Sequence, residues 1–274
     1  MKKRDMIVNT LARFRFHKLP FTREVSLDER FELPHFEQAL DGLLRSVEQR
    51  MSAALLAPAG TGKTALLRKL RSVLPEPRYH VHYVKVTDLS KRDMCREIAA
   101  ACGAESAGSY PMLVRRLQER FEQAYLNDAV RPVLLLDEAH DVRPDVLGML
   151  RILTNFEMDS KLVLSVVLAG QPPLGALLRH DRLEDVAQRL NFCVTLRLLS
   201  REETARYIEH RCAVAGAPTC PFAPEAVEAI FESGRGNLRA TDRIARGALE
   251  NAALLGHATV SVPHVIAARK SLTP

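Results

Sequence analysis

One glycine-rich segment constrains the fold of this chain more than any other part of the sequence. Residues 57–64 read Ala-Pro-Ala-Gly-Thr-Gly-Lys-Thr and lie between a short apolar run at 53–57 and a helix-forming stretch at 64–74. They match the pattern G-x-x-x-x-G-K-S/T except that Ala57 replaces the first glycine. An alanine fits there if its φ is negative, because only a positive φ requires glycine. A strand, a loop and a helix in this order predict an α/β fold with a phosphate-binding loop.

The loop residues have expected roles toward ATP. Their glycines let backbone N–H groups converge on phosphate oxygens, and the following helix adds the positive end of its dipole. Lys63 would bridge the β- and γ-phosphates, and the Thr64 hydroxyl would bind Mg²⁺. The residues expected to hold the nucleotide are Pro58, Ala59, Gly60, Thr61, Gly62, Lys63, Thr64 and Ala65. The alternative interpretation is an ordinary glycine-rich turn between a strand and a helix.

A second motif favours a nucleotide site over a plain turn. Residues 133–138 read Val-Leu-Leu-Leu-Asp-Glu, an apolar strand that ends in two acids. Asp137 would hold the Mg²⁺ shell, and Glu138 would orient and polarise the attacking water. By itself, the run could be a buried strand followed by a solvated acidic loop. After a phosphate-binding loop, the combination predicts an ATPase, and the second acid favours hydrolysis over binding alone.

Short apolar runs and amphipathic stretches alternate along the first 199 residues. Such an alternation predicts a parallel sheet flanked by helices. The further strands are expected at 80–86, 133–136, 162–169 and 192–196, and the further helices at 92–102, 111–127, 144–157 and 173–178. The runs at 133–136 and 162–169 are rich in Leu and Val, as expected for strands that are buried on both faces.

The pattern becomes purely helical from Ser200 onward. The run Ser-Arg-Glu-Glu at 200–203 predicts a capping box, in which Ser200 begins a helix and Glu203 reaches back to it. Helices are expected at 201–215, 224–233, 238–254 and 262–270. We therefore divide the chain into a basic segment with a lead-in helix (1–50), an α/β domain (51–199) and a small helical domain (200–274).

Composition narrows the class of protein further. The chain is 47% hydrophobic and 26% charged, which excludes a disordered chain, and its longest apolar stretch, 162–170, is too short to cross a bilayer. The five cysteines form no C-x-x-C pair, so we expect reduced thiols in a soluble, cytoplasmic protein without a zinc site. The net charge is 39 − 33 = +6, and residues 1–18 hold six basic side chains against one acidic one. This basic end permits an anionic partner, and the alternative is a solvated, frayed terminus.

Together, the two motifs resemble those of the AAA+ ATPases, and the resemblance extends over nearly the whole chain. It implies a parallel sheet of strand order 5-1-4-3-2 and a helical lid, which agrees with the division above. It also implies a polar residue at the end of the fourth strand that senses the γ-phosphate, and Gln171 stands there, with an ordinary loop glutamine before two prolines as the alternative. An arginine near the start of the fifth strand would reach the ATP of a neighbouring subunit. Arg189 is the candidate, with Arg179 and Arg182 in reserve, and the plain alternative is a surface arginine.

Two further positions follow from the same resemblance. Arg239 ends the run Gly-Asn-Leu-Arg at 236–239 and fits the lid arginine that couples lid position to the nucleotide. Pro34 and His35 begin a segment that resembles the part of the family that packs on adenine. For His35, a purely structural role is the alternative.

A finer resemblance is to the ExeA-like and transposition-helper branch, which includes proteins of the TniB, MuB and TnsC type. It is carried by Leu-Pro-Phe-Thr at 19–22, Leu-Asp-Glu-Ala-His at 136–140, Leu-Arg-Ile-Leu-Thr-Asn-Phe-Glu at 150–157, Val-Leu-Ala-Gly-Gln-Pro at 167–172 and Gln-Arg-Leu at 188–190. The helpers imply ATP-bound subunits that form a ring or filament on double-stranded DNA and recruit a transposase, with hydrolysis driving disassembly. The alternatives are a cytoplasmic ExeA-like secretion or assembly ATPase and a nucleotide-switched scaffold. The secretion type implies a membrane span and a periplasmic part, which this sequence lacks, so the helper is favoured.

The same branch indicates where DNA would be contacted. In the helpers, the contacts lie in the loop after the second strand and in the loop before the next long helix. The residues at these places are Lys91, Arg92, Ser109, Arg115 and Arg116. Lysine, arginine and serine side chains suit phosphate contacts, which give affinity without reading the base sequence. The alternative is a helix N-terminus with ordinary surface charges.

Overall fold

The chain folds into two compact units. A computed structural model describes residues 3–126 and 129–272. One unit is Pro34–Arg197, and the other joins Met1–Leu33 to Leu198–Pro274. The sequence-based division set 1–50 apart as a segment of its own. In the structure, residues 34–50 belong to the α/β unit, and the residues before them belong to the helical unit.

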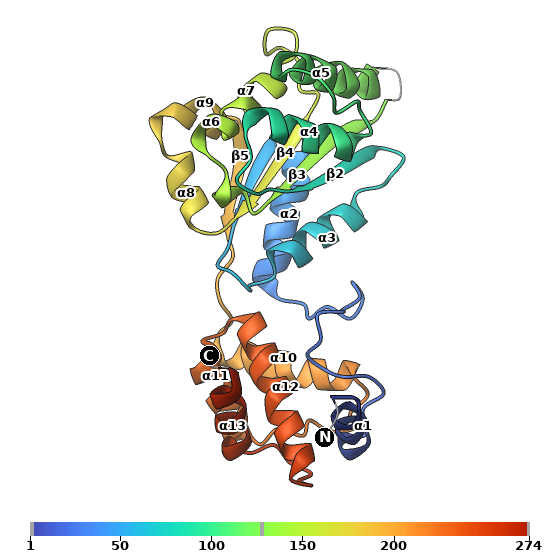
Figure 1. Cartoon of the computed structure of the whole chain (residues 1–274), viewed down its shortest axis with the longest axis vertical. Coiled ribbons are helices and arrows are strands. Elements are labelled where there is room, and N and C mark those ends of the chain that lie inside the picture. Colours follow the sequence, from blue (N-terminus) through green and yellow to red (C-terminus); the bar gives the residue numbers. More distant parts are fainter. Residues whose placement is uncertain (1–2, 127–128, 273–274) are drawn as a thin grey trace. The chain divides into compact units, whose positions relative to one another are not determined.

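The α/β unit is built on one five-stranded parallel sheet (Figure 1). Its strands are β1 (Ser52–Leu56), β2 (Tyr79–Lys85), β3 (Arg131–Asp137), β4 (Ser165–Gly170) and β5 (Leu190–Thr195). The order β2-β3-β4-β1-β5 confirms the predicted 5-1-4-3-2. Leu56 pairs with Gly170, and Lys85 pairs with Asp137. The register therefore brings the carboxyl ends of β1 and β4 side by side, next to that of β3.

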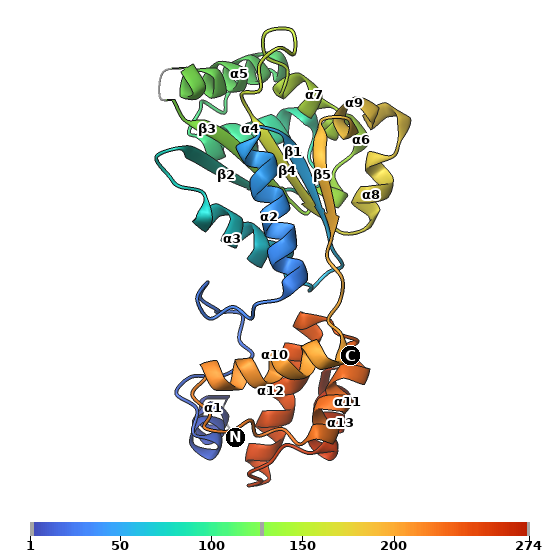
Figure 2. The same cartoon turned by 180° about the vertical axis from the view of Figure 1, so that it is seen from behind.

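Helices cover both faces of this sheet (Figures 1 and 2). One face carries α2 (Pro34–Glu48) and α3 (Lys63–Val73), and the other carries α4 (Lys91–Cys102), α5 (Tyr110–Leu126) and α7 (Met149–Leu153). The short elements η1 (Ala139–Asp141), α6 (Pro144–Leu147), α8 (Pro173–Leu178), η2 (Asp181–Leu183) and α9 (Glu184–Ala187) complete the unit. β3 and β4 are buried along nearly their whole length, which explains their continuous apolar sequence.

The single helix predicted at 144–157 is wrong. The structure has α6 and α7 with Gly148 between them, and glycine has a low helix propensity. After Leu153 the chain turns, because the Asn155 side chain accepts a hydrogen bond from the Asp159 N–H at 3.0 Å. Three consecutive residues of this turn have positive φ values, 45° at Glu157, 54° at Met158 and 70° at Asp159. β4 begins at Ser165, three residues later than predicted.

The helical unit consists of α1 (Lys3–Phe14), α10 (Arg201–Val214), α11 (Pro224–Gly234), α12 (Leu238–Leu254) and α13 (Val262–Leu272). The predicted capping box at the start of α10 is confirmed, because Ser200 accepts from the Glu203 N–H and the Glu203 carboxylate accepts from the Ser200 N–H. The core of this unit includes Phe21, Ile208 and Ala248.

The frayed N-terminus, the plain alternative of the sequence analysis, is wrong for the described residues. Helix α1 packs on α12, where the Asn9 side-chain amide donates to the carbonyl of Ala253 at 3.0 Å. Phe14 and Phe16 are buried in the core of the helical unit. The side chains of residues 1–5, which include half of the basic residues of the segment, lie outside the described ones. This N-terminal segment folds because its aromatic side chains are removed from water.

Candidate nucleotide site

The predicted phosphate-binding loop has the backbone that an anion site requires. It leaves the carboxyl end of β1 and enters α3 at Lys63. Gly60 and Gly62 have φ values of 77° and 99°, a region that favours glycine. Ala57 does not have a positive φ, and its buried N–H donates to the carbonyl of Gly170 at 2.9 Å. Alanine is therefore compatible with this position, where the pattern has its first glycine.

Lys63 lies folded over the loop. Its side chain is buried, and its ammonium group donates to the carbonyl oxygens of Ala57 at 3.0 Å and Pro58 at 3.3 Å. The Thr61 hydroxyl also donates to Pro58, at 2.7 Å, which tightens the turn. No acidic residue occurs in the first turn of α3. A buried ammonium beside a helix N-terminus favours an anion at this point.

The two candidate Mg²⁺ ligands come together although they are far apart in the sequence. The Thr64 hydroxyl donates to Asp137 Oδ2 at 2.9 Å. Asp137 is 2% exposed, and its Oδ1 accepts from the Glu138 N–H at 2.9 Å. A hydroxyl and a carboxylate are the hard oxygen ligands that suit Mg²⁺ together with substrate phosphates. Within residues 3–126 and 129–272, no group of three His, Cys, Asp or Glu side chains could hold a metal by itself.

Tyr83 is a site residue that the sequence analysis missed. From the neighbouring strand β2, its hydroxyl donates to Asp137 Oδ2 at 3.1 Å. Burial, together with the negative charge of Asp137, raises the pKa of Tyr83 to about 12. The phenol therefore stays protonated at neutral pH and acts as a donor. Nothing in the sequence marks this tyrosine, which stands within an apolar strand two residues before the partner of Asp137.

The proposed catalytic acid and the proposed phosphate sensor lie at the same edge of the sheet. Glu138 follows β3 and has a left-handed backbone, with φ 59° and ψ 32°. Gln171 follows β4, next to the end of β1. Between the two lies His140, a second residue that the sequence analysis gave no role of its own. Its ring is 2.5 Å from the Gln171 amide nitrogen and 3.6 Å from a carboxylate oxygen of Glu138.

Arg189 lies at the opposite end of the strands, directly before the amino end of β5. It precedes β5, whereas the phosphate-binding loop follows β1, and the two strands run parallel. At about 3.3 Å per residue, a strand of this length separates the two positions by roughly 20 Å. Arg189 therefore cannot reach the nucleotide of its own subunit. Of the alternatives, Arg179 ends α8 and Arg182 lies in η2, and both are exposed.

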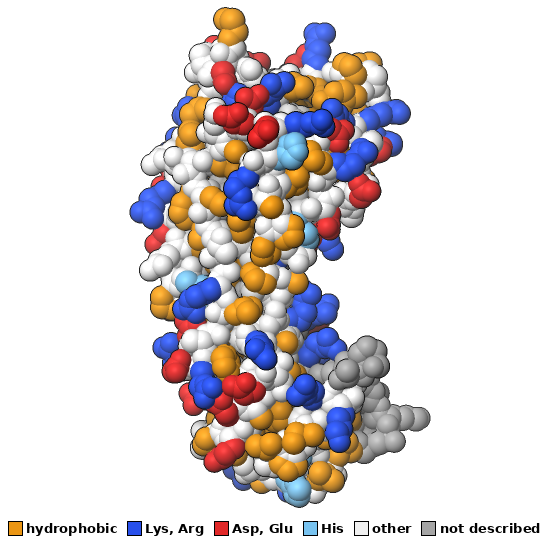
Figure 3. All heavy atoms as spheres, turned by 90° about the vertical axis from the view of Figure 1, so that its left-hand side faces the viewer, with side chains coloured by type: hydrophobic (Ala, Val, Ile, Leu, Met, Phe, Trp, Pro, Cys, Tyr) orange, Lys and Arg blue, Asp and Glu red, His pale blue; other side chains and the backbone are white. Residues whose placement is uncertain are grey.

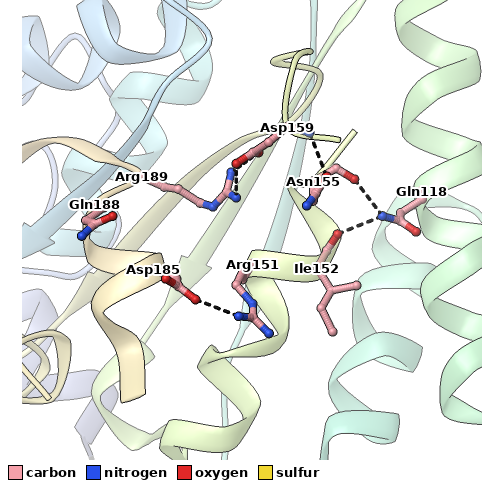
Figure 4. A pocket seen from close by; sticks show the side chains of 8 residues that line it. All are labelled: Gln118, Arg151, Ile152, Asn155, Asp159, Asp185, Gln188 and Arg189. Atoms are coloured by element: carbon pink, nitrogen blue, oxygen red, sulfur yellow. Dashed lines mark hydrogen bonds and ion pairs between the residues drawn. The ribbon is translucent and has the colours of Figure 1, made fainter. Parts of the chain in front are cut away.

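Arg189 borders a cavity of about 630 Å³ (Figure 4). Both of its terminal nitrogens pair with the Asp159 carboxylate, at 2.6 Å each. A second pair, Arg151 with Asp185 at 2.7 Å, lies beside it. The Gln118 amide donates to the backbone carbonyls of Ile152 in α7 and of Asn155 in the turn that follows it, at 2.8 and 3.1 Å. The cavity is thus lined mainly by charged and amide side chains, and Figure 4 shows Arg189 directed toward Asp159 and Arg151 directed toward Asp185.

The candidate DNA contacts cluster around the loop between α4 and α5. Arg92 donates to the carbonyl of Gly108 at 3.0 Å, and Arg116 donates to the carbonyl of Ala107 at 2.5 Å. Ser109 is the last residue of this loop and is exposed. Lys91 is 3.9 Å from Asp145. The structure therefore brings Arg92, Ser109 and Arg116 together.

Arg115 points away from that group, since it pairs with Glu119 at 2.8 Å on the outer face of α5. On the face drawn in Figure 3, charge alone does not mark a nucleic-acid surface. Lys and Arg side chains are interspersed with Asp and Glu side chains over this face.

Three predicted nucleotide contacts lie outside the loop. Pro34 and His35 begin α2, and the His35 ring packs edge-on against Phe36 at 5.1 Å. Arg239 is in the helical unit, exposed in the first turn of α12. Asn237 caps that helix by accepting from the Ala240 N–H at 3.1 Å. Contact of His35, Pro34 and Arg239 with a nucleotide stays a prediction.

With this geometry established, comparisons with known sequences agree with the motifs. Residues 45–178 match the family profile of the AAA domain. Among curated proteins, the chain is similar to general secretion pathway protein A of Aeromonas hydrophila, with 34% identity over 200 residues. The match covers 71% of this chain and 36% of that protein. The chain thus spans about a third of the relative's length.

Solved structures with a similar fold come from several proteins. Cdc6p of Pyrobaculum aerophilum gives a TM-score of 0.73 at 19% identity, over 92% of this chain and 70% of that one. The ORC1 protein of Aeropyrum pernix, solved in complex with DNA, gives 0.68 at 20% identity, over 89% and 67%. The RuvB Holliday junction branch migration motor of Thermotoga maritima gives 0.61 at 20% identity, over 92% and 73%. At these identities the likeness shows the fold.

No helix within residues 3–126 and 129–272 is both long enough and apolar enough to cross a bilayer.

Proposed function

We propose that this chain, which has the AAA+ fold and carries an AAA domain, hydrolyses ATP, assembles on double-stranded DNA and recruits a transposase. One observation supports the hydrolase above all. The Thr64 hydroxyl and the Asp137 carboxylate meet at 2.9 Å, beside a loop whose backbone suits phosphate. This pairing, between residues 73 positions apart, supports the proposed nucleotide–Mg²⁺ site.

The chain's own residues account for each step of hydrolysis. Lys63 and the loop N–H groups would bind the β- and γ-phosphates, and Thr64 and Asp137 would hold Mg²⁺. The ion, when bound, would neutralise charge on the transferred phosphoryl group. Glu138 would accept a proton from the attacking water as the bond from the γ-phosphorus to ADP breaks. Arg189 would stabilise the developing charge on the nucleotide of a neighbouring copy.

The position of Arg189 supports an assembly of several copies. It lies roughly 20 Å, the length of one strand, from the phosphate-binding loop of its own subunit. A second copy that supplies the arginine would make ATP binding and assembly depend on each other. Loss of the γ-phosphate would then weaken the contact between copies and drive disassembly, whether these form a ring or a filament.

Double-stranded DNA is the partner that the basic cluster favours. Arg92 and Arg116 are held by the loop between α4 and α5, with Lys91 beside them. Side chains of this kind bind phosphates without reading bases, which suits a protein that must occupy arbitrary target DNA. The transposase as the recruited partner rests on the finer resemblance of five sequence segments to the transposition helpers.

One observation favours a second candidate. The curated relative at 34% identity is a general secretion pathway protein, although the chain covers only 36% of it. The alternative function is therefore an ATPase of the secretion or assembly type whose partner is a protein. In that case ATP hydrolysis would be independent of DNA.

The test is an ATPase assay on the full chain, with and without duplex DNA. Glu138→Gln should lower turnover by about 10²- to 10⁴-fold while binding of ATP persists. Glu97→Gln, an exposed substitution with the same change of charge, should leave turnover unchanged. Wild-type turnover that rises on DNA supports the first candidate, and turnover that ignores DNA supports the second. Full activity of the Glu138→Gln variant would remove hydrolysis from both.

A further inference from the structure

The ring of His140 lies between Glu138 and Gln171. His140 belongs to η1, directly after β3, and its side chain is 10% exposed. Its Nε2 is 2.5 Å from the amide nitrogen of Gln171, and its Nδ1 is 3.6 Å from Glu138 Oε2. One ring therefore lies within reach of two polar side chains. The two have separate proposed roles and follow two different strands.

The polarity of these contacts follows from hydrogen-bond chemistry. An amide NH₂ group only donates, so the ring nitrogen that it faces must accept. The proton of the ring is then on Nδ1, and it points toward the Glu138 carboxylate. Asp141 is a weaker neighbour, because its exposed carboxylate is 3.5 Å from Nε2, one ångström farther than the Gln171 amide. If the carbonyl oxygen of the Gln171 amide faced the ring instead, the proton of the neutral ring would be on Nε2. Nδ1 would then have no proton to donate to Glu138.

The backbone at Glu138 and Gly170 brings His140 close to the end of β4. The left-handed conformation of Glu138 turns the chain out of β3 into η1, so that His140 folds back beside the end of β4. Gly170 allows the approach, because a Cβ there would meet the His140 backbone nitrogen at 3.0 Å and a Leu174 carbon at 2.9 Å. Any larger residue at position 170 would push η1 away from the end of β4.

The His140 ring and the Glu138 carboxylate lie close together but do not form a hydrogen bond. Both Glu138 Oε2 and His140 Nδ1 are buried, and neither has a hydrogen-bond partner among the described residues. Their separation of 3.6 Å is a few tenths of an ångström beyond a hydrogen bond. Buried polar atoms without partners are costly, so a small rotation that joins these two atoms is favourable. Such a rotation would hold one carboxylate oxygen on the ring and leave the other free to accept from water.

We infer that His140 is a positioning residue that links Gln171 to Glu138, so that contact of the amide with the terminal phosphate sets the orientation of the carboxylate. The inference rests on the proposed ATPase function and deepens it. Without ATP, the Gln171 amide holds the ring, whose Nδ1 stays 3.6 Å from the carboxylate, too far to orient it. When the amide turns to the γ-phosphate, the ring is free to close this gap, and its N–H then fixes one oxygen of Glu138 so that the other can accept a proton from water.

Three substitutions of His140 separate its two contacts. Asparagine carries its amide near the position of Nδ1, and glutamine carries its amide near the position of Nε2. His140→Asn should retain the Glu138 contact, His140→Gln the Gln171 contact, and His140→Ala neither. We expect kcat to fall by about 10- to 100-fold in His140→Ala, as for other residues that orient a catalytic group. The two amide variants should lie between it and the wild type, with KM and binding of a non-hydrolysable ATP analogue within about threefold of wild type.

A double variant tests whether the two residues act as one connection. If they do, His140→Ala combined with Gln171→Ala should lose no more activity than the worse single variant. Losses that multiply, or an unchanged kcat in His140→Ala, would overturn the inference. Thermal unfolding of each variant identifies those that fold, and the two amide variants suffice if His140→Ala does not. Wild-type protein without ATPase activity would refute the proposed function itself, which is a separate outcome.

Discussion

The guanidinium of Arg189 and the carboxylate of Asp159 form a bidentate ion pair, with both N–O distances at 2.6 Å. The hydrogen bonds from Arg189 hold the pKa of Asp159 below its usual range, so the pair stays charged at neutral pH. Asp159 belongs to a turn of three consecutive residues with positive φ. The arginine proposed to act on a neighbouring copy is therefore engaged within its own subunit.

This pair must open before Arg189 can reach another nucleotide. We expect Asp159→Asn to lower the protein concentration that gives half-maximal ATP hydrolysis, because the arginine is no longer held. Arg189→Ala should lower hydrolysis by about 10³-fold or more while nucleotide affinity stays within a few-fold. Arg151→Ala removes the neighbouring ion pair of the same cavity and is the matched control. A loss in Asp159→Asn as deep as in Arg189→Ala would show that Asp159 orients the arginine and does not restrain it.

The basic cluster near α4 predicts a measurable salt dependence of DNA binding. Replacing both Lys91 and Arg92 by alanine should weaken binding of any duplex sequence and reduce the slope of log K against log salt by about two. Arg96→Ala is the control, because Arg96 lies on the same helix and pairs with Asp93. Fluorescence anisotropy at several salt concentrations gives the slope. An unchanged slope in the double variant would place the DNA contacts elsewhere.

Removal of the Tyr83 hydroxyl should affect stability in a pH-dependent way. Tyr83→Phe loses one of the hydrogen bonds to Asp137, which costs about 1 kcal/mol of unfolding free energy near neutral pH. The pKa of Tyr83 is raised from 10.0 to about 12 in the folded protein, so this tyrosine ionises first in the unfolded state. The stability advantage of the wild type over the variant is therefore constant below pH 10 and shrinks as the pH rises toward 12. Urea unfolding at pH 8 and pH 11 measures the difference, and an advantage that grew with pH would contradict it.

Two glycines of the helical unit with the same φ test the packing before α12. Gly236 and Gly256 both have a φ of 72°. A Cβ at Gly236 would lie 2.0 Å from the Leu199 carbonyl oxygen, whereas at Gly256 the nearest atom is 3.9 Å away. Gly256→Ala should cost about 1 kcal/mol from backbone strain alone, and Gly236→Ala about 3 kcal/mol or more. Equal losses in thermal or chemical unfolding would contradict the close approach to Leu199.

The part of the site that the sequence revealed is the part made by neighbours in the chain. The loop from Ala57 to Thr64 forms its turn from its own glycines, and Asp137 and Glu138 follow an apolar strand directly. The capping box of Ser200 and Glu203 spans three residues. Such features need only local geometry. The alternation of apolar and amphipathic segments predicted a parallel sheet, whereas the strand order was implied by the family resemblance.

The remainder depends on contacts between distant residues. Tyr83 meets Asp137 across 54 positions, Gln171 meets His140 across 31, and Arg189 meets Asp159 across 30. No local pattern encodes these pairs, because they follow from the register of β2 on β3 and from the two turns that leave β3 and α7. In the same way, the hydrogen bond from Asn9 to Ala253 joins residues 244 positions apart. The sequence by itself determined which chemical groups the predicted nucleotide site contains. The tertiary structure decided which other side chains contact those groups, because burial and strand register act only between segments that folding has brought together.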